Sequence, residues 1–209
     1  EPTAAELQAE WSTKHATMDA TWSTTLGGGG VGLEIRAGSS GGGGPQVDPN
    51  QSTIAVAPST ISAGGAAATV TVTARSSNGT PLPNVVITLG ATGTGNTLSA
   101  PGATDNNGVY QGTLSSTKAE TKVITATAQL GGVTTLLNSS PIVTVVPGAT
   151  SASQSTVTGA PLSIAAGTAT STITVRVKDS FANPIPGATV TLSPTGSETT
   201  LSRPGGTGP

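Results

Sequence analysis

The chain has no cysteine, very few aromatic residues and little charge. Of its 209 residues, 9% are charged and 2% are aromatic. Without cysteine there is no argument from disulfides about the redox compartment. The formal net charge is −2 and there are no runs of like charge, so no electrostatic footprint for nucleic acid or anionic lipid exists. No apolar stretch is long enough to cross a bilayer. The composition therefore argues against nucleic-acid-binding and membrane-spanning proteins.

The chain also offers little for catalysis. His15 is the only histidine, and a Ser-His-Asp arrangement would need it to meet a serine of a distant segment. We expect His15 to pack in or beside a helix interface. No cluster of His, Cys, Asp and Glu has the spacing of metal ligands. We therefore expect a protein that is not an enzyme and has no cofactor.

What the sequence does contain is an internal repeat. Residues 52–106 align without a gap on residues 155–209, at an offset of about 103 residues. About 24 of the 55 aligned positions are identical, and Pro81-Leu82-Pro83 returns as Pro184-Ile185-Pro186. This repeat length is that of one small all-β domain. Tandem domains indicate spacing and display more than catalysis.

From residue 52 onward the hydrophobic pattern has a period of two. Val70, Val72 and Ala74 alternate with threonine over residues 69–74, which predicts a strand with one apolar and one hydroxylated face. Further strands are expected at 85–89, 97–98, 109–114, 123–128 and 142–146, with turn-forming residues between them. About seven short strands per roughly 100 residues predict an immunoglobulin-like β-sandwich. The fold class is therefore all-β, with tandem immunoglobulin-like sandwiches.

Four segments are expected along the chain. Residues 1–25 form an amphipathic helix, because Leu7, Trp11, Met18 and Trp22 recur at a period close to 3.6. Residues 26–51 form a linker with two glycine runs, which favour flexibility. The first domain, here named the first copy, spans 52–148. The second copy spans 152–209. The short junction 146–150 should limit bending between them, since Pro147 fixes one φ angle.

The second copy ends early, because Pro209 corresponds to Asn106 and nothing corresponds to residues 109–147. Half a sandwich exposes its inner face and unpaired strand edges. The sequence also begins with Glu1, which indicates a processed form or a fragment. We expect a truncated C-terminus, and the alternative is that a neighbouring chain donates the absent strands.

Two motifs carry a resemblance to a known family. Residues 78–83 read Asn-Gly-Thr-Pro-Leu-Pro, and residues 104–110 read Thr-Asp-Asn-Asn-Gly-Val-Tyr. In this order they resemble the bacterial immunoglobulin-like domain of invasin/intimin-type adhesins. The resemblance covers 52–147 as a full copy and 155–209 as the first half of another. It implies extracellular rods that hold a binding tip away from the cell, and hence a location at the cell surface or in the periplasm. In the second copy the turn reads Phe181-Ala182-Asn183-Pro184, so its glycine is lost.

Two binding sites were considered within the β region. Asp105-Asn106-Asn107-Gly108 places oxygen-bearing side chains before a glycine, but calcium needs about six to eight oxygens. We expect a tight β-turn there instead. A glycan platform needs exposed aromatic rings, and the β region has only Tyr110 and Phe181. Tyr110 is expected in the core, in phase with Leu114, so a glycan-binding module is the weaker interpretation.

The N-terminal helix carries the strongest signal for a partner. Its stripe of Leu7, Trp11, Met18 and Trp22 would contribute several kcal/mol on burial, at about 25 cal/mol per Å² of apolar area. Such a stripe favours a protein partner or self-assembly, although docking on the first copy is an alternative. The opposite face is mainly acidic, so direct contact with a membrane is disfavoured. We predict a structural or adhesive surface protein, with an accessory subunit of an envelope complex or filament as the alternative.

Overall fold

The structure is a computed structural model that describes residues 44–202 and 205–208. Pro45–Pro209 forms one compact unit that contains both copies. Within the part of the chain that is described, the regular elements are strands, and no helix is long and apolar enough to span a membrane. The helix expected over residues 1–25 and most of the linker lie outside the described residues.

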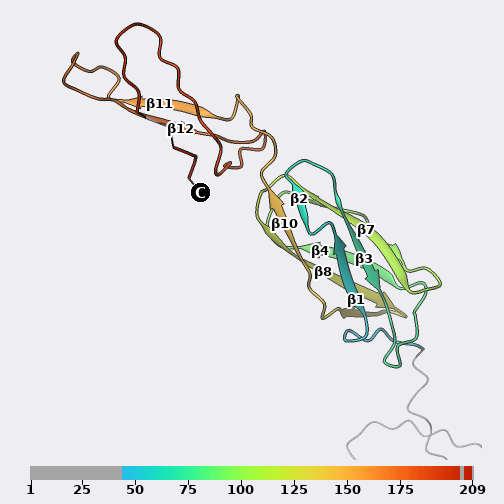
Figure 1. Cartoon of the computed structure of the whole chain (residues 1–209). Coiled ribbons are helices and arrows are strands. Elements are labelled where there is room, and N and C mark those ends of the chain that lie inside the picture. Colours follow the sequence, from blue (N-terminus) through green and yellow to red (C-terminus); the bar gives the residue numbers. More distant parts are fainter. Residues whose placement is uncertain (1–43, 203–204, 209) are drawn as a thin grey trace, which may run out of the picture. The chain divides into compact units, whose positions relative to one another are not determined.

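The first copy is a sandwich of two sheets (Figure 1). The first sheet has the strand order β1-β3-β7-β5, and all its neighbours are antiparallel. The second has the order β2-β10-β8-β4-β6, with β9 paired to β8. Its only parallel pair is β2 with β10. The bounds are β1 Thr53–Ala57, β2 Thr60–Ser62, β3 Ala68–Thr73, β4 Val86–Ala91, β5 Asn96–Leu98, β6 Gly102–Ala103, β7 Val109–Ser116, β8 Thr121–Leu130, β9 Val133–Leu136 and β10 Ile142–Val146.

The alternation in the sequence explains how these strands pack. In β3, Ala68, Val70 and Val72 are fully buried while the threonines between them lie at the surface or are half-buried, since successive side chains point to opposite faces of a sheet. The core between the sheets is made mainly of Val, Ile, Leu and Ala. Tyr110 is buried in it, as expected from its position in β7.

The tyrosine occupies a space that two glycines leave open. A β-carbon at Gly102 would lie 2.7 Å from Tyr110 Cε2, and one at Gly112 would lie 2.9 Å from the tyrosine hydroxyl. The hydroxyl donates to the carbonyl of Ala100 at 2.8 Å and lies 3.1 Å from Ser99 Oγ. The polar end of the one aromatic residue in this sandwich is therefore satisfied.

The second copy repeats the first half of the first copy. Its regular strands are β11 (Thr156–Ala160) and β12 (Thr172–Arg176), which pair antiparallel as β1 does with β3. A threonine links the same backbone positions in both. Thr104 Oγ1 donates to Leu82 O at 2.7 Å and accepts from Val85 N at 3.0 Å. Thr207 Oγ1 donates to Ile185 O at 2.6 Å and accepts from Ala188 N at 2.8 Å.

The inner face of this half sandwich is uncovered. Val157 is 66% exposed and Ile173 is 42% exposed, whereas their counterparts in the first copy, Ile54 and Val70, are buried. A cavity opens on this face, lined by residues that include Ile173, Val190 and Leu201. The all-β fold class and the immunoglobulin-like sandwich predicted from the sequence are confirmed.

Candidate functional site

The partner-binding residues predicted from the sequence cannot be placed. Leu7, Trp11, Met18 and Trp22, as well as His15, lie outside the described residues.

The segment considered for calcium is a turn. Asp105 Oδ1 accepts from Asn107 N at 2.9 Å and from Val109 N at 2.8 Å, and Gly108 N donates to Asp105 O at 3.0 Å. Gly108 has φ +73°, the conformation that the turn prediction required of it. Among the described residues there is no group of three or more His, Cys, Asp and Glu side chains placed to hold a metal. The prediction of a tight turn is confirmed.

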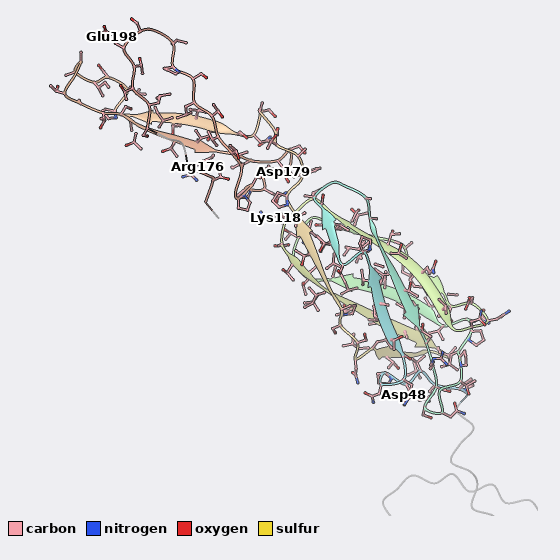
Figure 2. All side chains as sticks on the ribbon, in the orientation of Figure 1. Asp48, Lys118, Arg176, Asp179 and Glu198 are labelled. Atoms are coloured by element: carbon pink, nitrogen blue, oxygen red, sulfur yellow. The ribbon has the colours of Figure 1, made fainter. Side chains whose placement is uncertain are left out.

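The most unusual polar group of the described chain lies where the two copies meet. Asp179 and Asn183 belong to the turn after β12, and both side chains are buried. Asp179 Oδ1 accepts from the backbone N–H groups of Phe181 at 2.9 Å and Asn183 at 2.8 Å. Its Oδ2 accepts from Gly148 N at 2.9 Å. One carboxylate thus organises its own turn and binds the end of the first copy (Figure 2).

Asn183 extends this contact to the loop between β7 and β8. Its side-chain amide nitrogen donates to Thr117 O and to Asp179 Oδ2, both at 2.8 Å. Its amide oxygen accepts from Ala119 N at 3.0 Å. All three hydrogen bonds of the Asn183 side chain are direct, and two of them reach backbone atoms of the first copy. We name Asp179 and Asn183 the junction pair. We name the backbone groups that they bind, those of Thr117, Ala119 and Gly148, the backbone corner.

An aromatic ring lies beside the junction pair. Phe181 is 45% exposed, and its ring lies against Gly64, where an added β-carbon would be 2.2 Å from Phe181 Cε2. Gly64 has φ +69°, so glycine is favoured there for its backbone as well as for space. The next residue, Ala182, has φ +63°. The position where the second copy lost its glycine therefore keeps the left-handed conformation.

Hydrogen bonding favours the charged form of Asp179. Burial raises the pKa of this carboxyl, but hydrogen bonds from Asn183, Gly148 and Phe181 outweigh it, so the pKa lies below its ordinary value of 3.8. The carboxylate is ionised at neutral pH and accepts hydrogen bonds with both oxygens. Charge-assisted hydrogen bonds of this kind are roughly twice as strong as neutral ones.

A buried lysine supports the loop between β7 and β8, which carries Thr117 and Ala119 of the backbone corner. Lys122 is fully buried in β8, and its Nζ donates to Thr94 O at 2.6 Å and to Glu120 Oε1. Glu120 Oε1 also accepts from Thr94 N at 2.9 Å. The hydrogen bond from Lys122, followed by the one from Thr94, lowers the pKa of Glu120 below its ordinary value of 4.5. The lysine therefore ties the loop at residues 92–95 to Glu120, which follows Ala119 of the backbone corner.

Sequence reasoning did not identify the junction pair. From the sequence, the junction was interpreted as stiff because of Pro147, and the second turn was noted only because it lacks the glycine of the first turn. The available signal was the difference between the repeats, since Asp179 and Asn183 stand where the first copy has Ser76 and Thr80. An acid and an amide four residues apart in a chain poor in charge were the residues to examine.

The chain was compared with known proteins. Residues 51–146 and 153–208 match the family of the bacterial Ig-like domain (group 1). No curated protein matches the chain. Among solved structures it is similar to the Escherichia coli adhesin FdeC, with 26% identity and a TM-score of 0.50 over 68% of this chain and 46% of that one.

Two further structures share the fold. Invasin, a bacterial integrin-binding protein, is 21% identical with a TM-score of 0.51, over 68% of this chain and 28% of that one. InvD of Yersinia pseudotuberculosis is 21% identical with a TM-score of 0.52, over 68% of this chain and 44% of that one. The chain spans less than half the length of these three proteins.

These matches agree with the surface localisation and with the resemblance expected from the sequence. The two matched ranges also fall on the two repeats. The chain belongs to the family of bacterial Ig-like domains of group 1, which matches it over two successive ranges.

Proposed function

We propose that this chain is a non-enzymatic structural and adhesive element of the bacterial cell surface. The observation that carries the proposal is the pair of tandem Ig-like domains whose junction contains buried, directly hydrogen-bonded polar side chains. Similarity to the adhesin FdeC supports an adhesive role. The two copies, 52–148 and 152–209, act as spacers, with residues 1–25 as a helix and residues 26–51 as a linker.

The N-terminal segment is the anchoring or assembly element in this proposal. Its support is the spacing of Leu7, Trp11, Met18 and Trp22, which places two tryptophans, a leucine and a methionine on one face of a helix. A face of this kind takes a protein partner or a second copy of the same segment. The partner is therefore a protein, and the chain needs no cofactor.

Light scattering tests the assembly role directly. The solution mass of the whole chain is compared with that of a chain without residues 1–51 and with the double variant Trp11→Ala, Trp22→Ala. We expect a defined oligomer or filament for the whole chain and a monomer for the other two. The double variant Thr13→Ala, Thr24→Ala, on the opposite face of the expected helix, is the matched control and should keep the oligomer.

The opposite result separates the alternatives. If the whole chain is a monomer, self-assembly through residues 1–51 is refuted, and docking of the segment on a different envelope protein has to be tested by adding that segment as a competitor to cell extracts. If the tryptophan variant assembles like the whole chain, the four stripe residues are not the contact.

A further inference from the structure

The two copies form the same turn with different side chains. In the second copy Asp179 N donates to Asn183 O at 3.0 Å and Ala182 N donates to Asp179 O at 3.1 Å. In the first copy Ser76 N donates to Thr80 O at 3.0 Å and Gly79 N donates to Ser76 O at 2.8 Å. The backbone turn therefore forms with or without the junction pair, so the fold of the turn alone does not require an acid and an amide there.

Within residues 44–202 and 205–208, the side chains of the first turn form hydrogen bonds only inside that turn. Ser76 Oγ contacts Asn78 Oδ1 and Thr80 O, and Asn78 Oδ1 also accepts from Thr80 N at 3.2 Å. Arg75 Nη1 donates to Gly79 O at 2.7 Å. Every one of these partners lies within five residues, whereas Asn183 bonds to residues 64 and 66 positions away. The two turns thus differ in what they bind.

We propose that Asp179 and Asn183 are a latch that fixes the second copy on the first, and that the first copy lacks this latch on its own turn. The inference deepens the proposed spacer function and rests on it. The partner that the latch recognises is the end of an Ig-like domain of the same fold. Among the described residues, the chain accordingly has a fixed joint between its copies and no equivalent contact at the turn of residues 76–80.

The chemistry of the backbone corner defines that partner. The latch binds the N–H groups of Ala119 and Gly148 and the carbonyl of Thr117. These are backbone atoms, so the surface is recognised by its shape rather than by its side chains. Two glycines add a sequence requirement, because a β-carbon at Gly64 would overlap the ring of Phe181 and one at Gly148 would lie 2.9 Å from Ala63 O. A domain with this corner and glycine at both positions is a partner, whatever its other surface residues.

The geometry also explains why the latch needs one acid. At Asp179, Oδ1 accepts from two N–H groups of its own turn and Oδ2 accepts from Gly148 N and the Asn183 amide. An asparagine at this position presents one oxygen and one NH₂ group. Whichever way it is oriented, one set of N–H donors faces another donor. Asp179→Asn therefore keeps the size of the side chain and breaks the latch.

The absence of cysteine allows a direct measurement of the joint. Gln111→Cys in β7 and Thr158→Cys in β11 place spin labels on exposed residues of the two copies, and electron paramagnetic resonance gives the distribution of distances between them in the full chain. We expect a single narrow distribution. Asp179→Asn and Asn183→Ala should each lose it and give a broad one. The control Ser76→Ala, Thr80→Ala changes the same positions of the other turn and should stay narrow.

The results that overturn the latch are specific. A broad distribution in the parent chain, an unchanged one in Asn183→Ala, or equal broadening in the control each refutes it. Asn183→Ala decides the case if Asp179→Asn disturbs its own turn, because most of the contacts of Asn183 are to the first copy. Solution mass is measured on the same samples. The solution mass tests the proposed assembly function, and the width of the distance distribution tests the latch. A change in one without the other therefore bears on only one of the two proposals.

Discussion

Replacing Lys122 by alanine tests how a fully buried lysine contributes to the stability of the first copy. The side chain has no exposed area, and its ammonium group reaches Thr94 O and Glu120 Oε1. Two contributions are combined in it, the packing of its methylene groups and the pairing of its charge. The alanine variant removes both, and a methionine variant removes only the second.

The packing contribution follows from the burial. Alanine lacks about three methylene groups of lysine, which at about 0.8 kcal/mol for each buried group amounts to about 2.4 kcal/mol. With the cavity that is left, we expect Lys122→Ala to lower the free energy of unfolding by about 3 kcal/mol. In a domain of this size that lowers the midpoint of thermal unfolding by about 12–24 °C.

Methionine should recover most of this loss. It fills nearly the same space, and removing one partner of an ion pair is costly mainly when the charge left behind is buried. The partner left behind, Glu120, is 34% exposed and can be hydrated, and Thr94 O keeps a contact from Ser116 Oγ at 3.4 Å. Urea and thermal unfolding of the full chain, monitored by the signals of the first copy, measure both variants. If Lys122→Met is as destabilising as Lys122→Ala, the reasoning is wrong and the charge carries the stability.

Three further predictions concern the buried tyrosine, two glycines with positive φ, and the carboxylate at the junction. Tyr110→Phe removes a hydrogen bond to a backbone carbonyl and should cost about 1 kcal/mol in urea unfolding; no change would show that water replaces it. Gly79→Ala, with φ +80° and open space around the added carbon, should cost about 1 kcal/mol. Gly108→Ala, with φ +73° and a carbonyl 2.5 Å from that carbon, should cost clearly more, and equal values would contradict the steric argument. Since the folded-state pKa of Asp179 is lowered from 3.8, its stabilisation is present above that value and is lost as the pH falls through the lower folded-state value. Acid unfolding of the second copy should show this loss, and Asp179→Asn should remove it.

The fold of the first copy could be predicted where local pattern alone decides the structure. The alternation of Val70 and Val72 with threonine predicted β3, and the run Ile142–Val146 predicted β10 with its observed bounds. The strands β1, β2, β6 and β9, of five, three, two and four residues, were not predicted. Their pairing depends on neighbours that the rest of the chain places beside them, which local pattern does not contain.

The buried polar residues could not be predicted for the same reason. Lys122 is in phase with Ile124, so its position faces the core, but only the partners Thr94 and Glu120 make a buried ammonium group stable there. Asn183 is buried by contacts with residues more than sixty positions away. Sequence reasoning identified the second turn, and it related that turn to the missing glycine rather than to what the turn binds.

The parallel pair β2 and β10 determines how the first copy resists tension. These strands lie close to its two ends, and they pair over Thr60–Ser62 and Thr144–Val146. Further bonds run from Ala63 N to Val146 O and from Thr144 N to Ser59 O, both 2.8 Å. When the flanking chain is pulled in opposite directions, two parallel neighbours slide along each other, so these bonds are loaded together in shear. A surface protein under flow would then yield at this pair of strands only when the whole group of bonds breaks at once.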